Sequence, residues 1–184
     1  MLIETAPPYI RCWLLLCSDL AIRSGTAARL GPSNYDRARG ELVFTTKYQN
    51  KQRLPVTKEL ALLLDQCPDD ALPFSAQLPR ENGPTANRKY AMQPLGHITA
   101  KRLNRAFMLL KAKCGITRNL RPHDLRRATA TRVYDATHDL RVVQALLGHA
   151  DLGSTLYYLD HHVTPVMVST LELAKLNPIT ERPQ

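Results

Sequence analysis

The chain has 184 residues, of which 44% are hydrophobic, and this length accommodates one domain with a buried core, or one domain and an arm. Its 25 lysines and arginines outnumber 16 acidic residues, and the net charge of +9 favours a polyanionic partner, nucleic acid first, although a basic protein without such a partner has the same balance. The four cysteines form no CxxC pair and no apolar run could cross a bilayer, so we expect a cytosolic protein with reduced thiols, without a zinc site or a membrane partner.

The first predicted element is a core helix over residues 9–22, where apolar side chains recur at helical spacing. Ser24-Gly25 interrupts the pattern, and a second short helix is expected over residues 26–30. Arg23 therefore lies at a junction between two helices, from which its side chain can point into a cleft. Taken alone, however, an arginine at this place more often bonds the last carbonyl groups of the preceding helix.

An antiparallel β-hairpin is predicted next. Residues 34–40 are turn-like, and two β-prone runs follow at 41–46 and 52–56. The segment between the two runs places Lys47 and Lys51 at the tip of the hairpin. A lysine at a hairpin tip is usually only solvated, so this position alone assigns neither residue a function.

Two more helices and an irregular connection complete the middle of the chain. Thr57 is a suitable N-cap for a helix to about residue 66. Residues 67–96 are rich in proline and are expected to be irregular, whereas residues 99–114 have helical spacing. The last helix carries basic side chains that either follow DNA phosphates or are merely solvated: Lys101, Arg102, Arg105, Lys111 and Lys113.

The last third of the chain concentrates residues that bind phosphate. His123 and Arg126 are three apart, so they share one face of the helix expected there, and Arg127 beside them is a candidate phosphate or surface contact. Alone, His123 could equally be a buried core histidine.

A further helix is predicted over residues 140–147. Asp139 is its expected N-cap and Gly148 suits the left-handed position after its end, which leaves His149 just past the helix.

Two adjacent tyrosines follow a short polar link. Ser154 or Thr155 is expected to cap the start of a helix near Tyr157 and Tyr158. Neighbouring residues on a helix point about 100° apart, so only one of these two side chains can face a given site. Physical spacing alone does not choose between them.

The order of these residues resembles the catalytic domain of the tyrosine recombinases, the phage integrase family. HDLR begins at His123, LLGH ends at His149, and Tyr158 follows nine residues later. Upstream, LAIRSGTAARL resembles the segment around the family's first catalytic arginine, and TTKYQNKQRLPVT resembles its β-hairpin with a catalytic lysine. Each motif is weak alone, but their order forms a specific composite that covers nearly the whole chain.

The resemblance implies a mainly helical α+β fold with a small antiparallel hairpin or sheet. It implies an enzyme that cuts and rejoins DNA through a 3′-phosphotyrosyl bond without a cofactor or a metal ion. Its catalytic residues would be Arg23, Lys47, His123, Arg126, His149 and Tyr158. Candidate contacts to double-stranded DNA are Lys51, Arg102, Arg105 and Arg127.

The resemblance also implies a role for each catalytic residue. Tyr158, chosen over Tyr157 by family spacing, would attack the phosphorus. The two arginines would bind its non-bridging oxygens, and Lys47 would protonate the departing 5′ oxygen. His123 would assist proton transfer near the tyrosine, and His149 would hydrogen-bond the phosphate.

Three positions depart from the family pattern. Ala21 stands where relatives usually have glycine, and Thr26 and Asn34 stand where relatives usually have acidic residues. These positions support the first arginine in relatives. The changes at Ala21 and Thr26 give some support to one alternative, a non-catalytic DNA-binding protein on the same fold. A second alternative is a strand-relaxing enzyme like the type IB topoisomerases, which shares related chemistry without exchange between partner strands.

The domain organisation follows from the same resemblance. Residues 1–176 are expected to form one catalytic domain, without the N-terminal domain with which relatives clamp the other side of DNA. Residues 164–176 would be a C-terminal helix that docks on a neighbouring protomer, and residues 177–184 a frayed tail. Four protomers would assemble on two duplexes, with a monomer in isolation.

Overall fold

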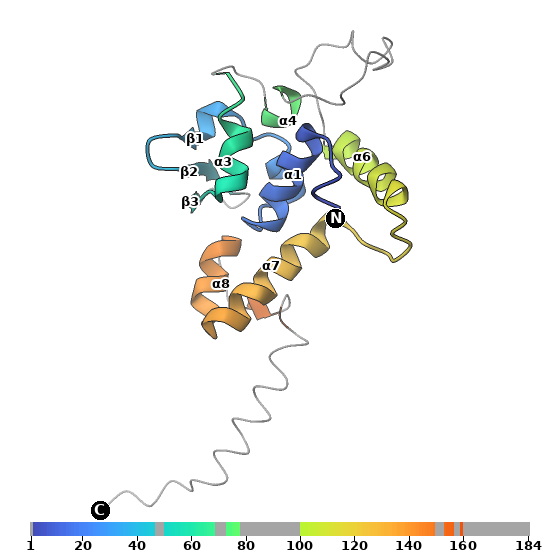
Figure 1. The fold of residues 1–184 in the computed structure, drawn as a ribbon. Helices are drawn as coiled ribbons and strands as arrows, with labels where there is room; N and C mark the ends of the chain where they lie inside the picture. Colours follow the sequence, from blue (N-terminus) through green and yellow to red (C-terminus); the bar gives the residue numbers. More distant parts are fainter. Residues whose placement is uncertain are drawn as a thin grey trace, which may run out of the picture.

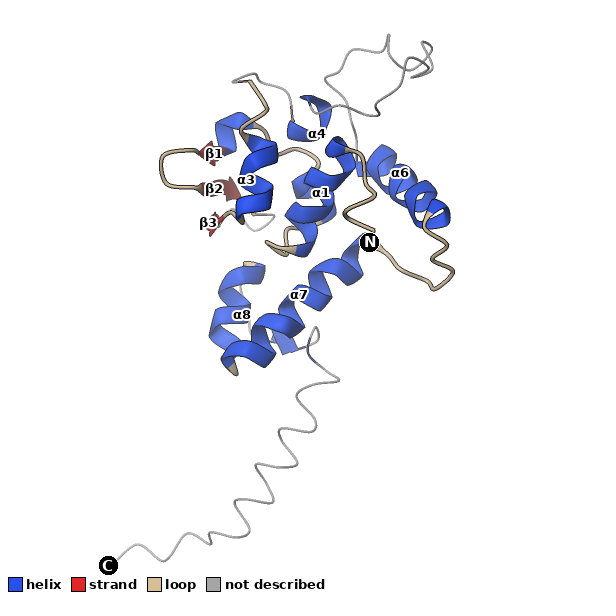
Figure 2. Cartoon of the chain, in the orientation of Figure 1, coloured by secondary structure: helices blue, strands red, loops and turns tan. Residues whose placement is uncertain are grey.

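The computed structural model describes residues 2–46, 50–68, 73–77, 100–149, 153–156 and 159 (Figure 1). Helices predominate in this part of the chain, and the strands form one small sheet (Figure 2). The helices are α1 (Pro8–Ser18), α2 (Ser24–Ala27), η1 (Pro32–Asn34), α3 (Lys58–Leu64), α4 (Phe74–Gln77), α6 (Ala100–Lys113), α7 (Pro122–Thr137) and α8 (Leu140–Leu147). Over these same residues, no helix is both long and apolar enough to span a bilayer.

Helix α1 lies at the centre of the fold and contacts α2, α3, α4, α6 and α7. Proline at its first position is compatible with a helix start, because that residue needs no backbone N–H partner. The helix ends at Ser18, so the predicted end at residue 22 is wrong. The chain turns at Ala21, whose φ is +51°, and Ile22 N donates to Leu16 O at 3.0 Å. The apolar spacing continues past the helix because residues 20–22 stay buried in the turn itself.

The second short helix also differs from its prediction, since it covers Ser24–Ala27 rather than residues 26–30. Arg23 is its N-cap, and its carbonyl accepts hydrogen bonds from Thr26 N and Ala27 N at 2.8 and 2.9 Å. Ser24-Gly25 thus forms the first turn of the helix. The expected position of Arg23 at a junction between two helices is confirmed.

The predicted hairpin is present as β2 (Glu41–Thr45) and β3 (Lys51–Pro55). The strands pair antiparallel, with Thr45 opposite Lys51, and a short strand β1 (Tyr35–Asp36) extends the sheet beyond β2. The sequence prediction missed β1 because it lies inside the turn-like segment. Residues 47–49, and Lys47 with them, lie outside the described residues.

Helices α3 and α6 are confirmed, and Thr57 caps α3 by accepting from Leu60 N at 3.4 Å. Helix α4 lies in the segment expected to be irregular, so that prediction is wrong there. Phe74 explains the helical turn: it is fully buried and packs edge-on against Tyr35, with ring centroids 6.5 Å apart. Residues 78–99 lie outside the described residues.

The apolar interior has two parts. A large cluster joins α1, the sheet, α3, α4 and α6, and we call it the main core. A smaller cluster, the site core, lies between α7, α8 and the turn after α1. Its buried members are Ala21, Ala130, Tyr134, Val143, Leu147 and Leu159.

Candidate active site

Helices α7 and α8 pack against each other (Figure 1). Helix α7 carries His123 and Arg126, and His149 follows the end of α8. Asp139 caps α8 by accepting from Arg141 N at 2.7 Å, and Gly148 ends it with φ of +60°. Both predictions about this helix are confirmed. The prediction that Ser154 or Thr155 acts as an N-cap is wrong, because both lie within a helical turn over residues 153–156.

Arg126 is the centre of the site and is only 3% exposed. Its guanidinium donates to the carbonyl of Ala21 and, through Nη2, to the carbonyl of Leu147 at 2.8 Å. Nη2 also lies 3.2 Å from Nε2 of His149. One buried cation therefore joins the turn after α1, the end of α8 and the histidine that follows α8.

Two of the predicted catalytic residues, Arg126 and His149, are thus brought together. His149 is 8% exposed, and its second ring nitrogen, Nδ1, lies 3.1 Å from Oγ1 of Thr155. Its backbone is held at the end of α8, because His149 N donates to Gln144 O and Gln144 Nε2 donates to His149 O, both at 3.2 Å. Sequence reasoning assigned Thr155 a different task and missed this contact.

Helix α7 also fixes the turn that leads to Arg23. Thr129 and Arg132 both donate to the carbonyl of Ser18, the last residue of α1, and the Arg132 bond is 2.8 Å long. With Arg126 they form a polar row at intervals of three residues on one face of α7. That spacing was visible in the sequence, and it indicates a face that binds a polar surface rather than an apolar core.

Arg23 therefore does not bond the carbonyls of α1, as an isolated arginine there would be expected to do. The carbonyl of Ser18 accepts from Thr129 and Arg132 of α7 instead. Arg23 is half-buried, and its side chain forms no hydrogen bond or ion pair with another described residue. Helix α7 thus holds the turn that carries Arg23, and the half-buried Arg23 remains partly accessible to a ligand.

His123 lies at the start of α7 and is largely exposed. Its pKa is lowered from the ordinary value of 6.5, first by partial desolvation and then by the charge of Arg126, with smaller effects of Arg23 and Arg127 in the same direction. Asp124 opposes the shift. The charges of Arg126, Arg23 and Arg127 therefore all act on His123 in the same direction.

The end of the hairpin docks on the end of α8. Gln52 of β3 donates through Nε2 to the carbonyls of Ala145 and Leu146, at 2.9 and 2.7 Å. A Cβ on Gly148 would lie 2.8 Å from Oε1 of Gln52 and 3.2 Å from Cγ2 of Thr46. Glycine is therefore favoured at position 148 both for its positive φ and for the close approach of the hairpin.

The candidate DNA contacts have different positions. Lys51 is exposed beside the hairpin tip, and Arg127 is half-buried on α7. Arg102 and Arg105 lie on α6, which packs on the other side of α1 from the sheet (Figure 1). Lys111 on the same helix is not a DNA contact, because it is buried and its Nζ donates to the carbonyl of Arg118 at 2.7 Å.

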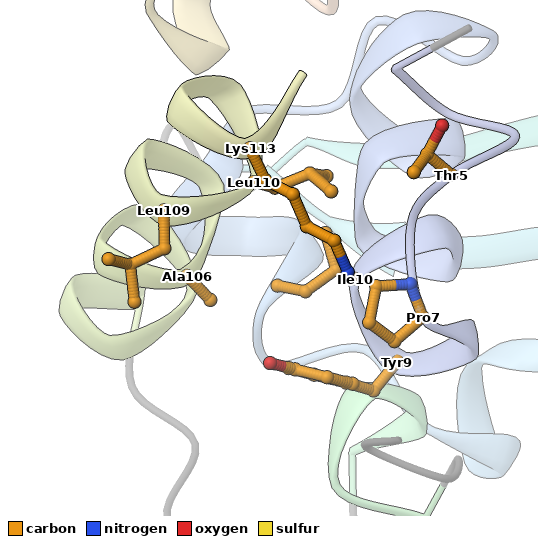
Figure 3. A pocket seen from close by; sticks show the side chains of 8 residues that line it. All are labelled: Thr5, Pro7, Tyr9, Ile10, Ala106, Leu109, Leu110 and Lys113. Atoms are coloured by element: carbon orange, nitrogen blue, oxygen red, sulfur yellow. The ribbon is translucent and has the colours of Figure 1, made fainter. Parts of the chain in front are cut away.

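A cavity of about 150 Å³ lies apart from these residues, between the start of α1 and α6 (Figure 3). Tyr9, Ile10 and Leu110 are among its lining side chains, and none of the predicted catalytic residues that the structure describes (Arg23, His123, Arg126 and His149) is. The candidate site is therefore the surface around Arg126 rather than this cavity.

The sequence as a whole places the chain among known proteins. Residues 2–164 match the phage integrase family. The chain belongs to this family. The expected fold class is confirmed as well, since the described residues are mainly helical with one small antiparallel sheet.

Curated members of the family are similar to parts of the chain. The tyrosine recombinase XerC of Actinobacillus succinogenes is 36% identical over 86 residues, which are 45% of this chain and 29% of that protein. The tyrosine recombinase XerC of Escherichia coli O127:H6 is 26% identical over 149 residues, 80% of this chain and 47% of that protein. The chain thus spans less than half the length of either relative.

Solved structures share the fold. The crystal structure of XerA recombinase superposes with a TM-score of 0.66 at 19% identity, covering 98% of this chain and 62% of that chain. A lambda integrase dimer bound to a COC′ core site gives a TM-score of 0.62 at 17% identity, covering 100% of this chain and 58% of that chain.

The departures from the family pattern have structural consequences of different kinds. Ala21 adopts a left-handed conformation, which glycine adopts without a steric penalty and alanine does not. Asn34 donates to the carbonyl of Val43 at 3.2 Å and accepts from Gly31 N at 3.1 Å, so it ties η1 to β2. No hydrogen bond joins the side chain of Thr26 to another residue that the structure describes.

Proposed function

We propose that the chain is the catalytic part of a site-specific DNA recombinase that cuts and rejoins strands through a 3′-phosphotyrosyl intermediate. The observation that carries this proposal is the buried contact between Arg126 and His149, beside the held turn of Arg23, in a member of the phage integrase family. Two arginines and a histidine close together can bind the oxygens of a scissile phosphate.

The chemistry is a pair of transesterifications. The phenolic oxygen of Tyr158 attacks phosphorus, the bond from phosphorus to the 5′ oxygen breaks, and Lys47 gives that oxygen a proton. The 5′-hydroxyl of a partner strand then attacks the phosphotyrosyl bond, and the tyrosine oxygen leaves. The phosphodiester energy is kept in the covalent link, so the cycle uses no nucleotide.

The arginines supply the electrostatic part of catalysis. A tyrosine with a pKa of about 10 is a weak nucleophile at neutral pH, so the site must favour its phenolate and stabilise charge on the pentavalent phosphorus. A guanidinium stays charged and matches two phosphate oxygens at once. Arg126 is held from several sides by protein groups, and a preorganised cation of this kind is the most effective type of transition-state stabiliser.

His123 and His149 have separate proposed roles. The lowered pKa of His123 favours a neutral imidazole, which is the form that accepts a proton from a tyrosine. His149 follows the end of α8, and we propose that it bonds the phosphate.

We further propose that double-stranded DNA in the cytoplasm is the substrate. The net charge of +9 supports a polyanion, and Lys51, Arg102, Arg105 and Arg127 are the proposed backbone contacts. The solved relatives include XerH site-specific recombinase bound to a palindromic difH substrate in a post-cleavage complex. The non-catalytic and topoisomerase-like alternatives find less support, because the curated relatives are recombinases by name.

The decisive test is a covalent trap. A pool of nicked duplex oligonucleotides with a randomised window is incubated with the protein, denatured in detergent, and searched for DNA that remains attached to protein. We expect an adduct that Tyr158→Phe abolishes and Tyr157→Phe retains. Loss of the adduct only in Tyr157→Phe would show that the other tyrosine is the nucleophile, and no adduct from the pool would favour the non-catalytic alternative.

Assembly is a separate proposal. Four protomers would act on two duplexes, with residues 164–176 of one protomer docked on the next. A Met167→Ala/Leu171→Ala variant is expected to elute as a smaller complex than wild type when both are bound to the trapped DNA. Unchanged elution of the variant would contradict docking by this segment.

A further inference from the structure

We infer that Thr155 is a positioning residue for His149. Its buried hydroxyl accepts a hydrogen bond from Nδ1–H of His149, and this bond keeps Nε2 directed toward Arg126. The inference rests on the proposed function: in the DNA-free chain Nε2 accepts from Arg126, and to bond a phosphate oxygen it takes up a proton while Nδ1 keeps its bond to Thr155.

The contacts around the imidazole carry the argument. Thr155 is 0% exposed, and its Oγ1 lies 3.1 Å from Nδ1. On the other side of the ring, Nη2 of Arg126 lies 3.2 Å from Nε2. Each ring nitrogen therefore lies beside a buried polar side chain.

The chemistry of Arg126 assigns the tautomer. A guanidinium has only donors, so Nε2 must present its lone pair to make this contact. The neutral ring then carries its proton on Nδ1, which donates to Oγ1 of Thr155. The opposite tautomer would direct two donors at each other in a buried place, which is unfavourable.

Thr155 supplies what the backbone of His149 does not. Gln144 fixes the main chain of His149 at the end of α8, but the ring can still rotate about its side-chain bonds. The hydroxyl of Thr155 selects one ring orientation from the opposite side. Without it, the Nδ1 proton loses its acceptor and the two tautomers become closer in energy.

The same bond links two motifs of the family. Thr155 precedes Tyr158 by three residues, and Leu159 of the same segment is buried in the site core. The hydroxyl therefore ties His149 to the segment of the chain that contains the proposed nucleophile. A substitution at Thr155 is therefore expected to act through His149.

The test measures the tautomer directly, in the full chain and without DNA. With nitrogen-15 labelled histidine, long-range proton–nitrogen NMR correlations distinguish a ring protonated at Nδ1 from one protonated at Nε2, and the His149 signals are assigned by their loss in His149→Gln. We expect the Nδ1 form in wild type and a shift toward the Nε2 form in Thr155→Val, which keeps the shape and lacks the hydroxyl. Thr155→Ser should restore the wild-type signals.

Thr129→Val is the matched control, because Thr129 is also a buried threonine whose hydroxyl bonds a polar group, the carbonyl of Ser18. It should destabilise the fold without moving the His149 signals. An unchanged tautomer in Thr155→Val, or an equal change in Thr129→Val, would overturn the inference.

The rate of adduct formation adds a second arm. On the trapped DNA, Thr155→Val is expected to be slower than wild type by about tenfold, as for other partners that orient a functional histidine, and Thr155→Ser should be close to wild type. An unchanged rate in a variant with an altered tautomer would overturn the positioning role. Absence of an adduct in wild type would contradict the proposed function alone, since the NMR result decides the tautomer independently.

Discussion

The main core and the site core are built in different ways. The main core is a continuous apolar cluster in which Trp13, Leu14 and Phe107 are fully buried. The site core has few apolar members, and buried polar side chains lie beside it: Arg126, Thr129, His149 and Thr155. Most of its connections run from a side chain to a backbone carbonyl of another element.

This difference separates stability from activity. Apolar burial is non-directional, so the main core tolerates small shifts at a cost in folding energy alone. A bond from a guanidinium to a named carbonyl is directional, so the site core fixes positions. Substitutions in the two regions should therefore separate into those that lower stability and those that lower cleavage per folded molecule.

The largest effect is expected at Arg126. Arg126→Met keeps the apolar stem and leaves two carbonyls and His149 without their donor, which should cost about 3 kcal/mol of folding free energy and abolish the adduct. Leu14→Ala in the main core should cost about 2 to 5 kcal/mol and leave the adduct rate per folded molecule unchanged. Urea unfolding and the covalent trap measure the two quantities. Equal losses of adduct rate in both variants would contradict the proposed difference between the main core and the site core.

A smaller effect is expected at Gly148. An added Cβ meets Gln52 at 2.8 Å, so Gly148→Ala should cost about 1 to 2 kcal/mol for its positive φ and a further amount for displacing the hairpin. Gly115→Ala is the matched control, because its φ is +67° and nothing lies within 4 Å of the added atom. Only Gly148→Ala should slow the adduct. A similar slowing in Gly115→Ala would contradict the docking role of this contact.

Gln52 tests the same junction from the other side. Gln52→Met removes two hydrogen bonds to the end of α8 and should cost about 1 to 2 kcal/mol of folding free energy, with a slower adduct. Arg53→Met on the same strand loses only an exposed ion pair with Glu41, and should change folding free energy by less than about 1 kcal/mol. Thermal unfolding of the two variants makes the comparison, and an equal loss in both would show that Gln52 does not anchor the hairpin.

The smallest effect concerns His123. Its pKa is lower in the folded chain than the ordinary 6.5, so the unfolded chain binds the proton more readily. The stabilisation from its neutral form is present above pH 6.5 and is lost as the pH falls through the lower folded pKa. An NMR titration should find this pKa below 6.5, and Arg23→Gln should raise it. A pKa of 6.5 or above in wild type, or no change in Arg23→Gln, would show that the arginines do not lower the pKa of His123 as proposed.

Local signals in the sequence were enough for much of this architecture. Asp139 and Gly148 predicted both ends of α8, and Thr57 predicted the start of α3, because capping depends on nearby residues. The family motifs indicated Arg126 and His149 as residues of one site, and the structure brings them together.

The rest depends on contacts between distant segments. The bond from Gln52 to α8 joins residues far apart in the chain, and no local pattern indicates it. Ala21 adopts a left-handed conformation that its residue type disfavours, and the contact with α7 holds it there, so the end of α1 was misplaced. Thr155 looked like a helix cap because threonine is common at caps, whereas its partner is a histidine on the preceding segment.

The central claim is that Tyr158 attacks a DNA phosphate held at Arg126. Fragmentation mass spectrometry of the peptide that carries trapped DNA tests it most directly, because the peptide that extends from residue 142 to residue 175 after digestion at lysine and arginine contains both tyrosines. We predict a nucleotide attached to Tyr158 in wild type, and no DNA-linked peptide in Arg126→Met. A nucleotide on Tyr157, or a DNA-linked peptide that persists in Arg126→Met, would contradict the claim.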